Sequence, residues 1–104
     1  MKTRKEYDSI GSVNVPVDKY WGASTERSKK YFNIGDILIN PILIQSIAII
    51  KKSAAIVHLK NKEIDKKIVK AIVKASDEII SGKLKEHFPL KVWQTGSGTQ
   101  TNMN

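Results

Sequence analysis

Two neighbouring stretches of the chain repeat their apolar residues at steps of three and four, the period of an α-helix that is buried along one side. The first opens at Asn40-Pro41, where asparagine can cap free backbone amides and proline loses nothing because the first helical position needs no N–H. The pattern predicts helices over about 40–60 and 62–81, with Gly82 as the stop. The residues expected to be buried are Leu43, Ile47, Ile50, Ala54 and Val57 in the first helix and Ile64, Ile68, Ala71, Ile72, Ala75 and Ile79 in the second.

The first of these helices is apolar over more than one stripe. Ile42, Ile44, Ala48 and Ile49 widen its apolar surface beyond a single face, so we expect it to need cover from more than one side. We do not expect it to cross a membrane, because polar and proline residues interrupt its start and two lysines follow. The interrupting residues are Asn40, Pro41, Gln45 and Ser46, followed by Lys51 and Lys52.

Residues 1–35 are mixed in character and rich in turn-forming residues. Between Gly11 and Gly22, the segment 13–17 alternates small apolar and polar side chains, which predicts a short strand or hairpin arm, with Pro16 limiting it to an edge. A turn at Trp21-Gly22 should lead into a short helix that ends near 33–35. The fold class is therefore mainly α, with two principal helices and a short N-terminal β arm.

Composition narrows the classes of function. The 104 residues carry 18 Lys and Arg against 10 Asp and Glu, a net charge of +8, and only two of the cations, Arg4 and Arg27, are arginine. Lysines four apart at 62, 66, 70 and 74 could bind nucleic acid, but a solvated helix face is the favoured interpretation. With no cysteine and two histidines, the chain is expected to hold no disulfide and no metal site built from cysteine or histidine. The first eight residues lack the apolar run of a signal peptide, which favours the cytoplasm.

Few side chains stand at a spacing that suggests catalysis. His58 and His87 lack a second ligand or a triad partner nearby in the sequence, so both are expected to be structural. Asp77 and Glu78 are adjacent on a helix and point in different directions, which favours surface charge over a shared-proton pair.

The segment 93–104 consists almost entirely of hydroxyl, amide and glycine residues. Gly96 and Gly98 permit backbone conformations that turn amides toward an anion, and the hydroxyls of Ser97 and Thr99 can reach the same point. This predicts a pocket for a small carboxylate or phosphate. Composition alone favours a polar, frayed C-terminal tail, although Trp93 is a large aromatic residue that normally packs. The segment has neither the ending of a phosphate-binding P-loop nor the third glycine of a dinucleotide fingerprint.

The sequence of this segment resembles the substrate-site stretch of class II fumarate hydratases. The matching residues are Trp93-Gln94-Thr95-Gly96-Ser97-Gly98-Thr99-Gln100-Thr101-Asn102-Met103-Asn104. The N-terminal arm resembles the same family. The residues that carry this second match are Arg4, Glu6, Asp8, Ser9 and Gly11, then Val15, Pro16 and Asp18, then Trp21, Gly22, Ala23, Thr25, Arg27 and Ser28, with Phe88-Pro89-Leu90 before the tryptophan. Ser24 stands where the family usually has Gln, and Thr101 replaces an equally common Ser.

The resemblance implies the N-terminal domain of the three-domain helical fumarase/aspartase fold, over residues 1–104. Its segments would be an arm and turn-rich segment at 1–35, a helical pair at 40–82 and a substrate loop at 91–104, with the central helical bundle and C-terminal domain absent. It implies reversible hydration of fumarate to L-malate in the citric acid cycle, without a cofactor, by a homotetramer. Ser97, Gly98 and Thr99 would bind the substrate carboxylate. No catalytic residue of the family falls within the chain, so it should be inactive alone.

Two other functions remain open on the sequence. An enzyme similar to aspartate ammonia-lyase shares the arm, but its counterpart loop typically lacks the wording of residues 93–95 and 97–100. A basic helical module that binds nucleic acid would use the lysines at 62–74, but it would leave the arm and the glycine-rich loop unexplained.

Overall fold

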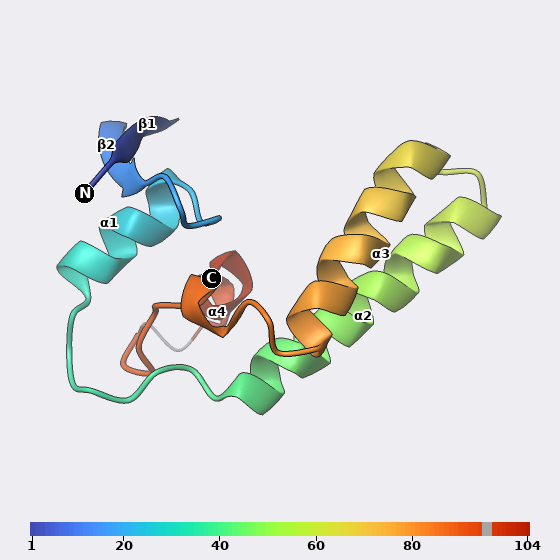
Figure 1. Ribbon diagram of the computed structural model, residues 1–104. Coiled ribbons are helices and arrows are strands. Elements are labelled where there is room, and N and C mark those ends of the chain that lie inside the picture. The colour runs from blue at the N-terminus through green and yellow to red at the C-terminus, as the bar shows by residue number, and fades with distance from the viewer. Residues whose placement is uncertain (95–96) are drawn as a thin grey trace. The chain divides into compact units, whose positions relative to one another are not determined.

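The structure is a computed structural model that describes residues 1–94 and 97–104. The chain forms two compact units (Figure 1). One consists of Met1–Ile39 together with Glu86–Asn104, and the other of Asn40–Lys85. The helical pair is therefore an insertion in the sequence of the first unit, and the N-terminal arm and the C-terminal loop belong to the same compact body.

The N-terminal arm is a two-stranded antiparallel hairpin of β1 (Thr3–Asp8) and β2 (Gly11–Pro16). The Asp8 carboxylate accepts hydrogen bonds from the amides of Ile10 (3.0 Å) and Gly11 (3.2 Å), which closes the turn between the strands. Gly11 has a φ of +138°, a conformation that L side chains rarely adopt. The predicted hairpin arm is confirmed, with Pro16 at the end of its strand.

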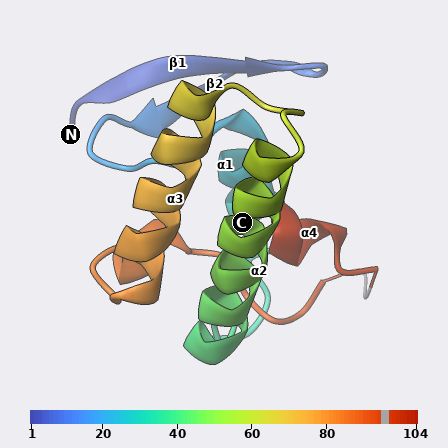
Figure 2. The same ribbon diagram turned by 90° about the vertical axis from the view of Figure 1, so that its right-hand side faces the viewer.

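The helix α1 (Ala23–Tyr31) follows the hairpin and packs against it (Figure 2). The predicted turn at Trp21-Gly22 leads into it, and the helix ends two residues before the expected stop. The indole N–H of Trp21 donates to the Glu26 carboxylate at 2.6 Å, and the ring is 7% exposed. Trp21 thus fixes the start of α1 to the core of this unit.

Arg4 ties the hairpin to the segment that leads into α1. Its guanidinium donates to the backbone carbonyls of Pro16, Lys19 and Trp21, each at 2.7 Å, and to Glu6 at 2.7 Å. Five donors in a rigid fork suit such a cluster of acceptors. One side chain therefore ties the end of β2 to the irregular segment before α1, and the Lys19 amide adds a second hydrogen bond to the Pro16 carbonyl at 3.2 Å.

The chain enters and leaves the helical pair through two short segments that pair with each other. The Ile39 amide donates to the Leu90 carbonyl (3.1 Å) and the Val92 amide to the Ile37 carbonyl (3.0 Å). Leu90 is 1% exposed, which makes it one of the most buried side chains of this unit. The single-turn helix η1 (Lys85–His87) precedes this pairing. Because of this pairing, the segment that starts at residue 91 belongs to the same unit as the N-terminal arm.

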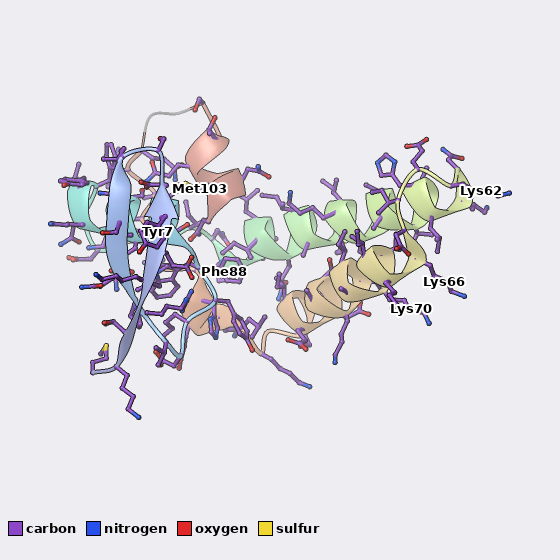
Figure 3. All side chains as sticks on the ribbon, turned by 90° about the horizontal axis from the view of Figure 1, so that it is seen from above. Tyr7, Lys62, Lys66, Lys70, Phe88 and Met103 are labelled. Atoms are coloured by element: carbon purple, nitrogen blue, oxygen red, sulfur yellow. The ribbon has the colours of Figure 1, made fainter. Side chains whose placement is uncertain are left out.

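The second unit is a helical hairpin of α2 (Pro41–Lys60) and α3 (Lys66–Ile80). The side chain of Asn40 accepts a hydrogen bond from the Ile42 amide at 2.9 Å, so the predicted cap is confirmed. The predicted start of the second helix at Lys62 is wrong. Lys62 lies in the turn (Figure 3), with a φ of +58°. Asp65 caps α3 because its carboxylate accepts a hydrogen bond from the Lys67 amide at 3.0 Å.

The predicted buried face of the helical pair is also largely wrong. Of the residues expected inside α2, Leu43, Ile50, Ala54 and Val57 are exposed and Ile47 is partly exposed, and in α3 Ile68, Ala71 and Ala75 are exposed. The buried residues are Ala48 and Ala55 of α2, facing Val69 and Ser76 of α3. Small side chains let two helices approach closely, so the seam follows Ala48 and Ala55 and leaves the larger apolar residues outside.

The exposed apolar surface of α2 agrees with the expectation that this helix needs further cover. Ile42 and Ile50 are 70% and 65% exposed. By length and composition alone α2 could also cross a membrane, with 11% of its most apolar window buried. The polar residues in the first half of α2 therefore do not exclude a membrane span, contrary to the expectation from the sequence. Buried core helices pass the same test, so composition does not decide between the two.

Substituting Ala55 by Leu should separate α2 from α3. Ala55 is 3% exposed in the seam, and adding three carbons to a packed site costs about 1–3 kcal/mol. Its neighbour Ala54 is exposed and serves as the matched control. We expect denaturant unfolding followed by far-ultraviolet circular dichroism to show lower stability for Ala55→Leu and little change for Ala54→Leu. Equal effects would show that the seam has been assigned to the wrong face.

Candidate functional site

Ser97 lies on an exposed turn directly before α4 (Thr99–Met103), and Thr99 is the first residue of that helix. The Ser97 hydroxyl donates to the Thr99 hydroxyl at 3.2 Å, and the Thr99 amide donates to the Ser97 Oγ at 3.4 Å. Between them Gly98 has a φ of +82°, which brings the two side chains to the same side of the turn. Thr95 and Gly96, also part of the predicted pocket, lie outside the described residues. The structure therefore brings together the two hydroxyls that the sequence singled out.

The turn is anchored through α4, which packs against α1 (Figure 1). The Gln100 side chain amide donates to the hydroxyl of Ser28, and both residues are buried. At the other end of α4, the Thr25 hydroxyl donates to the Met103 carbonyl at 3.4 Å. These contacts are not those of a frayed polar tail, so the tail interpretation of this segment is wrong for the described residues.

The lead-in to the turn is held by its own side chains. The Thr101 hydroxyl donates to the Gln94 side chain at 3.2 Å, and the Gln94 amide donates in turn to the Lys91 carbonyl at 3.2 Å. Trp93 is 61% exposed, so it packs only in part. Its ring edge lies against Gly35, where a Cβ would come within 2.9 Å of the Trp93 Cδ1.

A groove of about 370 Å³ runs beside the turn, between α1, the tip of the β-hairpin and α4. Its lining is mostly apolar, from Ile10, Tyr31, Phe32 and Met103, and Thr99 and Gln100 form part of it. One face of Thr99 therefore borders an apolar groove, and its hydroxyl lies beside that of Ser97.

One ion pair lines the same groove. The Arg27 guanidinium donates to the Asp8 carboxylate at 2.7 Å and to the Ser12 carbonyl at 3.3 Å. The hydrogen bond from Arg27 holds the pKa of Asp8 below its usual value, with the amides of Ile10 and Gly11 adding to the effect. A carboxyl with a lowered pKa stabilises the fold above its ordinary pKa, and this contribution is lost as the pH falls through the lowered one. The pair is fully formed at neutral pH.

The other titratable candidates have structural partners. The ring of His58 lies 2.5 Å from the Glu63 carboxylate and lowers the pKa of Glu63 through that hydrogen bond. His87 accepts a hydrogen bond from the Tyr20 amide at 3.0 Å and stacks on the Tyr20 ring. Among the residues that the structure describes, no three metal-binding side chains gather in one place.

The acidic pair and the lysine stripe lie on the helical hairpin. Asp77 pairs with Lys52 at 2.6 Å, as expected of surface charge. Lys62, Lys66 and Lys70 are exposed and project outward (Figure 3). Because Lys62 belongs to the turn before α3, the predicted four-residue stripe is shorter on the helix than the spacing suggested.

Sequence reasoning did not assign roles to Ser28 and Gln100. The two residues are 72 positions apart, and nothing in their local sequence indicates that they meet. Both fall inside the segments that carry the family resemblance, which was the one available signal.

Comparison with known proteins assigns the family. The sequence pattern described as Lyase matches residues 11–104. The chain belongs to this lyase family. Among curated proteins, this lyase chain is 53% identical over 104 residues to the class II fumarate hydratase of Campylobacter jejuni, covering 100% of this chain and 22% of that protein. It is 53% identical over 103 residues to the mitochondrial fumarate hydratase of Saccharomyces cerevisiae, covering 97% of this chain and 21% of that protein.

Solved structures agree with this lyase assignment. A class II fumarase from Schistosoma mansoni matches with a TM-score of 0.93 and 43% identity, covering 97% of this chain and 22% of that one. A fumarate lyase:delta crystallin from Brucella melitensis matches with a TM-score of 0.92 and 39% identity, covering 98% of this chain and 23% of that one. The lyase chain spans about a fifth of the length of these relatives. The predicted fold class and the resemblance to class II fumarate hydratases are confirmed.

Proposed function

We propose that this chain provides part of the substrate site of a class II fumarate hydratase, which adds water reversibly to fumarate and yields L-malate. The observation that supports it best is the pair of exposed hydroxyls of Ser97 and Thr99, 3.2 Å apart around Gly98. Sequence identities of about 50% to class II fumarate hydratases over the whole chain support the substrate class. Each hydroxyl can donate one hydrogen bond to a carboxylate oxygen.

The chemistry of hydration explains why neutral donors suit this position. In the reverse direction a proton leaves the carbon next to a carboxylate, and negative charge builds on the carboxylate oxygens. Donors already in place stabilise that charge without reorganising during the reaction. Ser97 and Thr99 would thus bind one carboxylate in the ground state and stabilise it more strongly in the transition state.

The groups that move protons are proposed to lie outside this chain. His58 and His87 are engaged with Glu63 and Tyr20, away from the hydroxyl pair in the sequence and in their contacts. We therefore expect residues 1–104 alone to be inactive, with the segments 1–35, 40–82 and 91–104 acting as one N-terminal domain. The proposed assembly is a homotetramer without a cofactor in the cytoplasm, although the S. cerevisiae relative is mitochondrial by name.

A chimaera tests this function. In it, this chain replaces the matching part of the C. jejuni relative, which shares 53% identity with it. We expect the chimaera to convert fumarate to L-malate, followed by the loss of fumarate absorbance, and the isolated chain to show no turnover above background. A folded chimaera without activity would contradict the proposed function. Turnover by the isolated chain would contradict the placement of the proton-transfer groups.

The two alternatives predict other results. An enzyme of the aspartate ammonia-lyase type would release ammonia from L-aspartate, which we do not expect from the chimaera. A nucleic-acid-binding module would retain DNA or RNA with an affinity that falls steeply with salt. We expect only weak retention in a filter-binding titration of the isolated chain at two salt concentrations.

A further inference from the structure

We propose that Gln100 and Ser28 form a buried latch that positions Ser97 and Thr99 for substrate binding. The Gln100 side chain donates from Nε2 to the Ser28 Oγ, and the two residues are 8% and 7% exposed. This inference rests on the proposed function, because the latch positions the hydroxyls that the function requires. Neither residue is expected to touch substrate, so both are positioning residues.

The latch acts on the turn through α4. Gln100 follows Thr99 directly, and the Gly98 and Gln100 carbonyls accept hydrogen bonds from the amides of Asn102 (3.1 Å) and Asn104 (3.0 Å). These hydrogen bonds make α4 a short helix that moves as one unit with its first residue, Thr99. Holding Gln100 against α1 therefore fixes the end of the turn that carries the hydroxyls.

The centre of the turn is a glycine, which carries no side chain. Gly98 has a φ of +82°, and a Cβ placed on it would meet no atom within 4 Å. Gly98 therefore has no side-chain packing of its own, and the restraint on its backbone is the hydrogen bond from the Asn102 amide of α4 to its carbonyl, at 3.1 Å. The position of the Thr99 hydroxyl then depends on how firmly α4 is held. The Thr25 hydroxyl, at 3.4 Å from the Met103 carbonyl, restrains only the far end of α4.

Burial makes the loss of the hydrogen bond between Gln100 and Ser28 costly. A buried amide that loses its acceptor keeps its full desolvation cost, so α4 would shift to find another partner. A displacement of about 1 Å in a substrate-binding group can reduce the rate about a hundredfold. The latch thus links a contact between α1 and α4 to the geometry of the exposed turn.

Two substitutions in the chimaera test the latch. Gln100→Met keeps the length of the side chain and removes its donor, and Ser28→Ala removes the acceptor. We expect each to raise the KM for fumarate and to lower kcat/KM by about ten- to a hundredfold. Ser28→Thr keeps the hydroxyl and should stay within a few-fold of the unsubstituted chimaera. Because the two residues share one bond, the double variant should lose little more than either single variant.

A matched control separates positioning from loss of folded protein. Val15 is fully buried in β2 of the same unit and is part of neither α4 nor the turn, and Val15→Ala lowers stability. Val15→Ala should at most reduce the amount of folded, active enzyme, and it should leave the KM for fumarate unchanged. If Gln100→Met and Ser28→Ala behave in the same way, with KM unchanged, the latch is contradicted while the proposed function stands.

Hydrogen exchange provides a reading that does not need activity. We expect the amides of Asn102 and Asn104 to exchange faster in the Gln100→Met and Ser28→Ala chimaeras than in the unsubstituted one and in Val15→Ala. If the unsubstituted chimaera is folded but inactive, the proposed function fails, and this exchange still decides the latch. Unchanged exchange at both amides would overturn it.

Discussion

Replacing Ser97 or Thr99 by alanine in the chimaera is expected to lower kcat/KM for fumarate by about 10²–10³, the loss seen when one preorganised donor is removed from an oxyanion site. The two hydroxyls are exposed and 3.2 Å apart, so both can reach one carboxylate. Because the substrate loses one of two donors, KM should rise and kcat should fall together. Steady-state kinetics on fumarate and on L-malate should show the same factor, since both reactions pass through one transition state.

Two further variants sharpen this prediction. Thr99→Ser keeps the hydroxyl and should retain most of the activity that Thr99→Ala loses. Ser53→Ala removes an exposed serine hydroxyl that donates to the Ile49 carbonyl in α2, and it should leave the kinetics unchanged. Unchanged kinetics in both Ser97→Ala and Thr99→Ala would remove these residues from the substrate site.

Replacing Arg4 by methionine is expected to destabilise the unit that contains the hairpin by about 2–4 kcal/mol. Hydrogen bonds from a charged group contribute about 1.5–3 kcal/mol each, and Arg4 makes three to backbone carbonyls. The side chain is 31% exposed, so water can replace part of that loss. Trp21 and Trp93 both lie in this unit, so tryptophan fluorescence during denaturant unfolding reports on it alone.

The neighbouring residue provides the control for Arg4. Lys5 is exposed on the opposite face of β1, and Lys5→Met changes charge and volume in a similar way. We expect a change of less than about 0.5 kcal/mol for this variant, as for other surface substitutions. A similar loss from both substitutions would show that charge, not the contacts with the three carbonyls, determines the stability of the unit.

The ends of the elements could be read from the sequence because local chemistry decides them. Asn40 caps α2 through its own side chain, and Gly82 follows the end of α3 with a φ of +83°. Lys62 shows the limit of such reasoning. A lysine is compatible with a helix, so its side chain does not predict a turn. The turn forms because Asp65 is the better N-cap for α3.

The buried face of the helical pair could not be read in the same way. On α2 the apolar residues extend over most of the circumference, so two different stripes fit the same helical period. Choosing between them requires the shape of the partner helix. The small side chains of Ala48 and Ala55 decide it, because they allow the closest approach of α3.

In the candidate site, too, some residues could be predicted from the local sequence and others could not. Ser97 and Thr99 could be singled out because they lie within one continuous run of residues and match a known pattern. Ser28 and Gln100 could not, because their contact joins residues from opposite ends of the chain. Such a pairing depends on the docking of α4 against α1, which no local pattern encodes.

The most direct test of the account is a crystal structure of the chimaera with fumarate or an unreactive dicarboxylate bound. We predict that one carboxylate lies within hydrogen-bond distance, about 2.5–3.0 Å, of both the Ser97 Oγ and the Thr99 Oγ1. The Gln100 side chain should still donate to Ser28 in that complex. A dicarboxylate bound elsewhere, with both hydroxyls facing only protein or water, would contradict the central claim that this turn binds the substrate.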